Sequence, residues 1–500
     1  MTALSLASVL AEPARRRPDV TALVEGPARL SYGELWRDAR AVAAALAARG
    51  CGPGDRVALL APNVADFVRC YFGILAAGGV VVPVPTLLTE REAAQIVSDS
   101  GAGVMLYHRR FAQVGTAAAE AAGIPAYDVA GLGESQRTFR TFITRQAEDL
   151  AVIFYTSGTT GTPKGAMLSH LNLVMNATTN AFDSNGLSAD DVVMGALPLF
   201  HTFGQSAAMN ASFRVGATLV LQPRFDAAAA LELMVREGVT RFLGVPTMFI
   251  QLLRAAQEAP RLPRLTSCTS GGAALPVAVL EEFEKVFGTT IYEGYGLSET
   301  SPTATVNQRA FGTRPGTVGH SVWGVEVEIA DAAVLDRIDL LPSGETGEIV
   351  IRGHNVFAGY LNRPEATAEV MVDGWFRTGD IGSKDADGFV TIVDRRKDLI
   401  IRAGFNVYPR EIEEVLARHP DVGQVAVIGV PDADRGEEIC AVVVPRPGHE
   451  IDVDALLAWG KENLAHHKYP RLVRVLPELP MGPSQKVLKR ELRRRFSAQP

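Results

Sequence analysis

Apolar residues follow two alternating patterns along the first three hundred residues. Short apolar runs, such as 56–61 and 80–84, are typical of buried strands. Longer segments between them carry the spacing of amphipathic helices. The segment 31–48 is one of these, and it begins with Ser31 and Glu34 at the positions of a helix capping box. Strands that alternate with helices predict an α/β fold with parallel strands.

The pattern changes near residue 312, where apolar segments alternate between Gly, Pro and Asp turns. We therefore predict a large N-terminal domain over 1–393, made of stacked α/β sheets and a small β-barrel-like part over about 312–393. A charged segment at 394–398 is the predicted hinge. Residues 399–500 predict a smaller α+β domain with its own core.

Composition and charge exclude several classes of protein. The chain has 500 residues, of which 47% are hydrophobic, and its net charge of −7 argues against nonspecific nucleic-acid binding. Its four cysteines lack metal-site spacing and fit a reducing compartment. The apolar stretch 71–88 is interrupted by Gly and Pro, and we see no secretory signal. We expect a cytoplasmic protein without an integral membrane segment, either a monomer or a homodimer.

The stretch Tyr155–Gly165, YTSGTTGTPKG, follows an apolar run that predicts a buried strand. Its glycines allow close backbone approach to an anion, its hydroxyl and amide groups can donate to phosphate oxygens, and Lys164 adds a positive charge. The spacing differs from the GxxxxGK[ST] loop. By itself the stretch predicts either a phosphate-binding loop or a solvated turn.

Two further predicted strands, 266–270 and 289–292, also end in turns rich in Gly or hydroxyl residues. Ligands of open α/β sheets bind beyond the carboxyl ends of strands. We therefore expect the three turns to share one site.

Five motifs occur in a fixed order and cover nearly the whole chain. They are YTSGTTGTPKG, EGYGLSET (293–300), WFRTGD (375–380), DRRKDLIIRAGFNVYPREIE (394–413) and SQKVLKREL (484–492). Together they resemble the adenylate-forming superfamily of acyl-CoA synthetases and other AMP-binding enzymes, and among these most the fatty-acyl-CoA ligases. The resemblance implies an acid–thiol ligase that uses ATP, Mg²⁺ and coenzyme A. A carboxylate attacks the α-phosphate of ATP, and a thiol then displaces AMP from the acyl-adenylate.

The resemblance also implies roles for individual residues. Lys486, Glu299, His201 and Lys164 would be catalytic, and Thr156 and Glu299 would bind Mg²⁺. The residues implied in binding ATP or coenzyme A are Thr156, Ser157, Gly158, Thr159, Thr160, Gly161, Lys164, Gly272, Ala273, Ala274, Glu293, Gly294, Tyr295, Ser298, Asp380, Arg395, Lys397, Gly404, Phe405 and Lys486.

Three of these roles concern a mobile C-terminal domain. Lys486 would bridge the carboxylate and the α-phosphate in the first step. The domain would then rotate as a lid about Lys397, so that Gly404 lets the pantetheine arm pass. Gln485 stands where the family usually has Gly, which alters the backbone freedom beside Lys486.

Four of these residues can also be explained by a structural role alone. Asp380 can be a turn residue, Glu299 an acid that a helix N-terminus favours, and Lys486 part of a solvated helix face. His201 can be a packed core histidine or a gate of the acyl tunnel.

The substrate prediction depends on the segments that the family uses for its acyl pocket. No Lys or Arg occurs between Gly195 and Phe213, so a second carboxylate would be buried without a partner. The lining expected from these segments is Phe203, Ala207, Ala208, Met209, Phe242, Val245, Phe249, Leu297 and Ala304. An apolar monocarboxylic acid with a medium or long aliphatic chain is the first prediction, and an aryl acid of the benzoate or cinnamate type is the alternative.

The acceptor and the activity itself leave further alternatives. Free coenzyme A is the predicted acceptor because no inserted loop near the hinge is visible. A carrier protein would present the same thiol. A non-catalytic adenylate-binding protein is the least favoured alternative.

Overall fold

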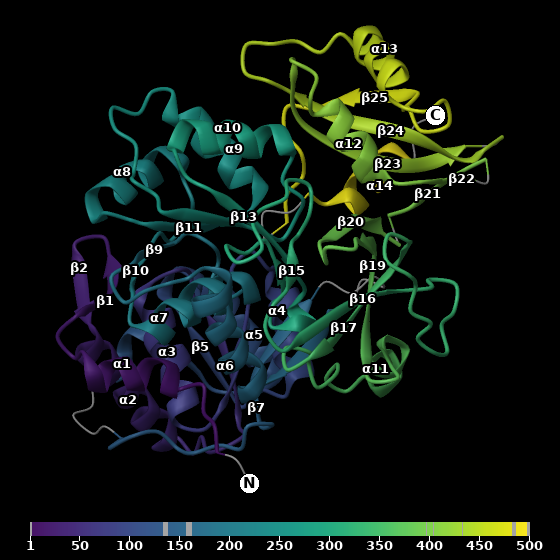
Figure 1. Cartoon of the computed structure of the whole chain (residues 1–500). Coiled ribbons are helices and arrows are strands. Elements are labelled where there is room, and N and C mark those ends of the chain that lie inside the picture. The colour runs from purple at the N-terminus through teal and green to yellow at the C-terminus, as the bar shows by residue number, and fades with distance from the viewer. Residues whose placement is uncertain are drawn as a thin grey trace.

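The computed structural model describes residues 3–133, 139–156, 163–396, 398–403, 405–432, 434–482 and 487–497. The chain winds through two α/β sheets, then a β-rich part, then a separate C-terminal domain (Figure 1). The predicted fold class is therefore confirmed.

The first sheet has six strands in the order β6-β5-β3-β4-β7-β8. Their bounds are β3 (Arg56–Leu60), β4 (Val80–Pro83), β5 (Val104–Tyr107), β6 (Ala126–Asp128), β7 (Leu150–Thr156) and β8 (Lys164–Ser169). The ladders are parallel except for the antiparallel hairpin of β7 and β8. Because Thr156 pairs with Lys164 at the loop end of this hairpin, the two residues lie side by side.

The second sheet has nine strands in the order β15-β14-β13-β12-β11-β9-β10-β1-β2. Their bounds are β1 (Thr21–Glu25), β2 (Ala28–Ser31), β9 (Val192–Gly195), β10 (Thr218–Leu221), β11 (Arg241–Gly244), β12 (Ser267–Ser270), β13 (Ile291–Gly296), β14 (Thr303–Val306) and β15 (His320–Ser321). Six neighbouring strands of this sheet run parallel, so their carboxyl ends share one edge. They are β1, β10, β9, β11, β12 and β13.

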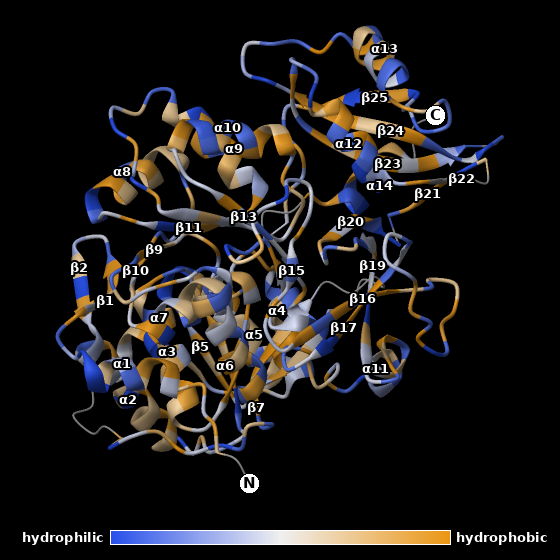
Figure 2. Ribbon diagram, in the orientation of Figure 1, coloured by the Kyte–Doolittle hydropathy of each residue, from blue (hydrophilic) through white to orange (hydrophobic). Residues whose placement is uncertain are grey.

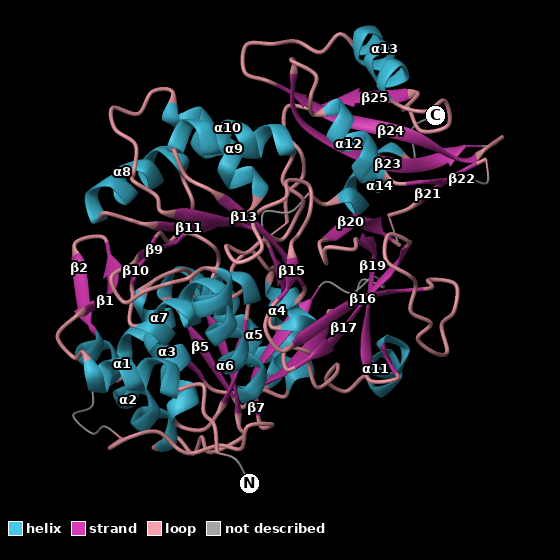
Figure 3. Ribbon diagram, viewed as in Figure 1, coloured by secondary structure: helices cyan, strands magenta, loops and turns pink. Residues whose placement is uncertain are grey.

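Helices cover both faces of these sheets (Figure 3). Their bounds are α1 (Ser8–Arg16), α2 (Tyr32–Ala47), α3 (Ala65–Ala76), α4 (Glu90–Ser100), α5 (Ala112–Ala122), α6 (His170–Thr179), α7 (Ala211–Val215), α8 (Ala227–Glu237), α9 (Pro246–Ala256) and α10 (Val277–Phe287). Two π-helical segments, η3 (Asn180–Ser184) and η4 (Phe203–Asn210), and the 3₁₀ turn η5 (Ser298–Thr300) lie among them. Ser31 and Glu34 form the predicted capping box of α2.

The core follows from the hydrophobic pattern. Strands of both sheets are apolar in the interior, whereas helices carry polar residues on their outer faces (Figure 2). Tyr71, Phe72 and Phe213 are fully buried in the largest cluster, which spans both sheets. Among the described residues, no helix is long and apolar enough to cross a membrane.

The β-rich part and the C-terminal domain follow in order. The former contains β16 (Val325–Ala330), β17 (Thr346–Gly353), α11 (Pro364–Val370), β18 (Met371–Val372), β19 (Trp375–Lys384) and β20 (Val390–Arg395). The latter contains β21 (Ile400–Arg402), β22 (Phe405–Val407), α12 (Pro409–Leu416), β23 (Val422–Asp432), β24 (Gly436–Pro445), α13 (Val453–Asn463), β25 (Leu472–Val475) and α14 (Lys489–Phe496). Two apolar clusters made only of C-terminal residues give this domain its own core.

Three local details differ from the sequence prediction. The loop predicted through Gly165 ends earlier, because β8 begins at Lys164 and closes a hairpin with β7. The strand predicted to end at Tyr292 continues to Gly296, since β14 pairs with it beyond that point. Asp380 lies inside the long strand β19 and not in a turn. All three extensions depend on partner strands that are distant in sequence or unpredicted, so local patterns do not reveal them.

A buried ion pair lies at the amino ends of the parallel strands of the second sheet, opposite the edge formed by their carboxyl ends. Arg241, the first residue of β11, donates to both carboxylate oxygens of Asp191 over 2.9 and 3.2 Å. Both residues are buried, and Arg241 also donates to the backbone oxygen of Asn185. Removing one partner of such a pair leaves a buried charge without compensation.

We therefore expect Arg241→Met to lower the free energy of unfolding by about 3 kcal/mol. Urea unfolding followed by tryptophan fluorescence measures this. Arg15→Met is the matched control, because Arg15 pairs with Glu12 on the surface and its loss should change stability little. Equal effects of the two substitutions would contradict the role of the buried pair.

Candidate active site

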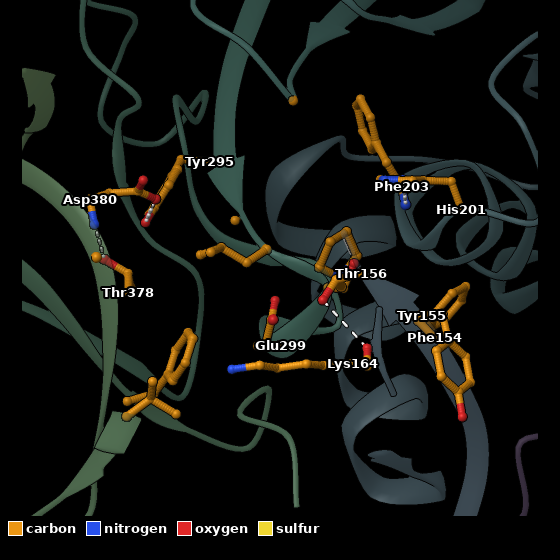
Figure 4. A pocket seen from close by; sticks show the side chains of 18 of the residues that line it. Phe154, Tyr155, Thr156, Lys164, His201, Phe203, Tyr295, Glu299, Thr378 and Asp380 are labelled. Atoms are coloured by element: carbon orange, nitrogen blue, oxygen red, sulfur yellow. Dashed lines mark hydrogen bonds between the residues drawn. The ribbon is translucent and has the colours of Figure 1, made fainter. Parts of the chain in front are cut away.

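The ends of β7, β12 and β13 converge on one cavity of about 1300 Å³. The strand β19 and the turn η5 also line this cavity. The prediction that the three strand ends share one site is therefore confirmed. Figure 4 shows Thr156, Lys164 and Glu299 near one another, with Tyr295, Thr378 and Asp380 on one side of them and His201 and Phe203 on another.

One end of the cavity carries a hydroxyl, an ammonium and a carboxylate. Thr156 ends β7 and Lys164 begins β8, and the Thr156 hydroxyl donates to the Lys164 backbone oxygen over a long 3.5 Å. Glu299, in η5, faces them and lines the same cavity. The stretch between the two strands, with Ser157, Gly158, Thr159, Thr160 and Gly161, lies outside the described residues.

The Glu299 side chain is buried, and burial raises its pKa. Its Oε1 accepts a hydrogen bond of 2.8 Å from the Tyr360 hydroxyl. A carboxylate and a hydroxyl are suitable ligands for Mg²⁺, which usually keeps water and phosphate oxygens as its other ligands. The part of the chain that the structure describes holds no group of three or more His, Cys, Asp or Glu placed for a metal. Glu299 and Thr156 thus fit an Mg²⁺ ion that arrives with a nucleotide.

The opposite side of the cavity presents a fixed carboxylate. Asp380 is buried and accepts a hydrogen bond of 2.6 Å from the Tyr295 hydroxyl, and it forms an ion pair with Arg395, whose Nε lies 3.1 Å from its Oδ1. Its backbone N–H donates to the Thr378 hydroxyl. The Asp380 carboxylate raises the pKa of Arg395, and burial raises that of Tyr295 well above its usual range. The Tyr295 hydroxyl and the Arg395 guanidinium therefore hold the Asp380 side chain in one orientation at the cavity wall, where it can accept from sugar hydroxyls.

Glycines form the wall between these two sides. Gly271 and Gly272 follow β12, Gly294 and Tyr295 belong to β13, and all four line the cavity. Gly272 has a φ of +82°, which any other residue adopts only with strain. Small residues leave room for a flat ring, whereas the neighbouring Ala273 and Ala274 are exposed and do not line this cavity.

Glu293 lies behind this wall. Its side chain does not line the main cavity but faces a small one beside Asn307 and Arg314. Its Oε1 accepts from the Leu275 backbone N–H over 3.2 Å, and burial raises its pKa to about 7. Glu293 therefore supports the loop that contains Gly271 and Gly272 from the far side.

The third part of the cavity contains His201, Phe203 and Ser298. The Ser298 hydroxyl accepts a hydrogen bond of 3.1 Å from Thr202. The backbone N–H of Phe203 donates to His201 Nδ1. The Phe203 ring lies so close to Gly271 that a Cβ placed there would be 3.1 Å from its Cζ.

The lining of this third part differs from the sequence prediction. Phe203 and Leu297 line the cavity as predicted. Phe242 and Phe249 instead pack edge-to-face on each other in the core, and Phe249 packs in the same way on Phe283. The other predicted lining residues, which do not line the cavity, are Ala207, Ala208, Met209, Val245 and Ala304. The lining residues that the prediction missed are Asn180, Phe200, Thr269, Pro302 and Thr303.

The C-terminal domain contributes Arg490, at the start of α14, to the rim of the cavity. Phe405 is 55% exposed and packs against the His467 ring, away from the cavity. Lys397, Gly404 and Lys486 lie outside the described residues. Tyr360, which no sequence motif singled out, is a further lining residue.

Matches to known proteins fit this cavity. Residues 10–361 match the family model described as AMP-binding enzyme, and 411–486 match that of the AMP-binding enzyme C-terminal domain. The chain belongs to the AMP-binding enzyme family. The predicted superfamily, the predicted ligase activity class and the predicted use of ATP, Mg²⁺ and coenzyme A are thereby confirmed.

Several of the similar proteins are named for different acids. The chain is 36% identical to a long-chain-fatty-acid–CoA ligase of Bacillus subtilis, covering 98% of this chain and 94% of that one. It is 39% identical to a feruloyl-CoA synthase of an Amycolatopsis species, covering 97% of each. ATP-bound MatB from Rhodopseudomonas palustris has a TM-score of 0.89 at 35% identity, covering 98% of this chain and 99% of that one. A benzoate CoA ligase from Burkholderia xenovorans has a TM-score of 0.88 at 28% identity, with the same coverage.

The raised pKa of Glu293 makes stability depend on pH. Between about pH 4.5 and 7, an unfolded chain ionises this carboxyl while the folded protein keeps it protonated. The folded state therefore loses stability as pH rises through this window. Glu293→Gln keeps the acceptor for Leu275 without the charge, so its stability relative to the parent should rise by on the order of 2 to 3 kcal/mol between pH 5 and 8.

Urea unfolding of both proteins across this pH range measures the difference. Glu281→Gln, at an exposed position of α10, is the control and should show no such trend. A difference between Glu293→Gln and the parent that stays constant with pH would contradict the assignment.

Proposed function

We propose that this chain converts an apolar monocarboxylic acid to its coenzyme A thioester by way of an acyl-adenylate, with release of AMP and pyrophosphate. The observation that carries the proposal is the single cavity that joins three different surfaces. One holds Thr156, Lys164 and Glu299, one holds Asp380, and one lies beside Phe203.

The first step must bring a carboxylate to a polyanion. Lys164 offsets phosphate charge at the hairpin end, and Glu299 and Thr156 would hold Mg²⁺. When bound, the ion neutralises part of the charge that develops on the phosphates. Lys486 bridges the acid and the α-phosphate in this proposal, a role that depends on the SQKVLKREL motif.

Nucleotide orientation depends on the opposite wall. Asp380 accepts from the ribose hydroxyls while Tyr295 and Arg395 hold its carboxylate in place. The base lies against the Gly271–Gly272 backbone. A fixed ribose keeps the α-phosphate at one distance from the acid, which lowers the entropic cost of the reaction.

The second step follows rotation of the C-terminal domain about the 394–398 hinge. Asp394 accepts from the backbone N–H of Arg410, and Arg410 also donates to the Ile392 oxygen over 2.6 Å. Rotation must exchange these contacts between the domains. Lys397 is the proposed pivot, and Gly404 and Phe405 belong to the segment proposed to meet the pantetheine arm.

The acid end of the cavity supports a monocarboxylate. The described cations of the lining, Lys164, Arg377, Arg395, Arg396 and Arg490, come from the hairpin, the β-rich part, the hinge and α14. A second carboxylate beside Phe203 would thus lack a partner among the described cations.

The closed position of Phe203 against Gly271 favours a compact, flat acid of the aryl type. A long aliphatic chain, the first prediction from the sequence, requires this ring to rotate away. Relatives named for ferulate and for long-chain fatty acids are both known. Free coenzyme A as acceptor, the oligomeric state and a cytoplasmic location stay predictions from the sequence.

Acid-dependent exchange of labelled pyrophosphate into ATP tests the proposal. A panel should run from acetate through benzoate and ferulate to palmitate. Exchange with at least one apolar monocarboxylate is expected. Absence of exchange with every acid would instead favour a non-catalytic adenylate-binding protein. Product analysis with coenzyme A and with acyl carrier protein then identifies the acceptor.

Lys486→Ala should abolish acid-dependent exchange but spare thioester formation from supplied acyl-adenylate. The reason is that the ammonium offsets charge only in the first step. Lys461→Ala, at an exposed position of α13, is the control and should leave both steps unchanged. Equal loss of both steps in Lys486→Ala would contradict the assigned role.

Phe203→Ala should open the acid end of the cavity. Because each buried methylene contributes about 0.8 kcal/mol, room for two more should raise kcat/KM for longer acids about tenfold relative to benzoate. Phe311→Ala, which removes an exposed ring, is the control. An unchanged chain-length profile in Phe203→Ala would show that this ring does not limit the pocket.

A further inference from the structure

The side chain of Tyr360 lies between two charged side chains of the cavity. Its hydroxyl donates to Glu299 Oε1 over 2.8 Å, and the Lys164 Nζ lies 5.1 Å from the centre of its ring. Tyr360 itself lines the cavity. One side chain thus contacts both the carboxylate proposed for Mg²⁺ and the cation proposed for the phosphates.

The backbone around Tyr360 makes the same connection. Ala358 and Leu361 donate to the backbone oxygens of Met167 and Gly165, so the segment 358–361 pairs with the free edge of β8. Just before it, the Phe357 N–H donates to the Glu299 backbone oxygen over 2.9 Å. The segment therefore links the β7–β8 hairpin to the turn that carries Glu299.

Packing fixes the orientation of the Tyr360 ring. The ring packs edge-to-face on Phe357 with centroids 4.8 Å apart, and Phe357 packs in the same way on Phe376. The Tyr360 N–H donates to the Thr367 hydroxyl. A ring packed against Phe357 on an anchored backbone presents its hydroxyl at one place, so little rotamer entropy is lost when it binds Glu299.

We propose that Tyr360 is a positioning residue that holds Glu299 and Lys164 in register for the metal and the triphosphate. The hydroxyl fixes one carboxylate oxygen and leaves the other oxygen to face the ion. The π face of the ring attracts the Lys164 ammonium and keeps it beside the hairpin. This inference rests on the proposed function, because it takes Glu299 as an Mg²⁺ ligand.

The test uses Tyr360→Phe, which removes the hydroxyl and keeps the ring. Electron paramagnetic resonance measures Mn²⁺ binding in the presence of a non-hydrolysable ATP analogue, independently of turnover. We expect about fivefold to tenfold weaker Mn²⁺ binding, because a hydrogen bond to an ionised carboxylate is lost. The free Mg²⁺ needed for half-maximal exchange should rise by the same factor, while the rate at saturating Mg²⁺ stays near that of the parent.

Tyr360→Leu also removes the ring. It should weaken binding of the ATP analogue itself, because Lys164 loses its contact. Tyr127→Phe and Tyr127→Leu are the matched controls. Arg49 lies 4.6 Å from the centre of the Tyr127 ring in a similar cation–π contact, and Tyr127 belongs to β6, at the opposite edge of the first sheet from β8. Neither Tyr127 substitution should change the binding of Mn²⁺ or of the ATP analogue.

A double substitution separates positioning from general stability. In Glu299→Gln, the further change Tyr360→Phe should have no added effect on Mn²⁺ binding, because the hydroxyl acts through this carboxylate. Mn²⁺ binding by Tyr360→Phe equal to that of the parent, or full additivity in the double variant, would overturn the inference. Failure of the proposed function would differ, since the parent itself would then show no acid-dependent exchange.

Discussion

Two anions must meet in this cavity, and that electrostatic constraint explains much of the structure around it. A carboxylate approaches a triphosphate only where fixed positive charge and a metal ion compensate the repulsion. The hairpin of β7 and β8 places Lys164 at the site, and η5 brings Glu299 opposite to it. The β-rich part supplies the facing carboxylate of Asp380, held by Tyr295 and Arg395. Two α/β sheets and the β-rich part thus all contribute charged groups to the cavity.

Rigid and variable parts of the site are clearly separated. The side proposed for the nucleotide is built from strand ends, glycines and buried hydrogen bonds. The side proposed for the acid depends on the π-helical segment η4 and on the position of one ring, Phe203, against Gly271. A single side-chain rotation there changes the space for the acid while leaving the phosphate side untouched. Similar proteins that are named for different acids are consistent with this division.

Local sequence patterns predicted most of the α/β part, because capped helices and apolar strands such as 31–48 and 80–84 carry strong signals. The convergence of three strand ends also followed from the parallel topology. Contacts between segments that are distant in the sequence could not be predicted from local patterns. Tyr360 reaches Glu299 only because 358–361 adds to the edge of β8. Phe242 and Phe249 were expected in the pocket, but they pack edge-to-face on each other, and Phe249 on Phe283, in the core.

The transfer of oxygen from the acid to AMP tests the central claim most directly. With a carboxylate labelled with ¹⁸O in both oxygens, attack on the α-phosphate leaves one labelled oxygen in AMP after thioester formation. Mass spectrometry of the products should therefore show AMP with one ¹⁸O and unlabelled pyrophosphate. Label in phosphate or pyrophosphate, or a thioester formed with unlabelled AMP, would contradict the account.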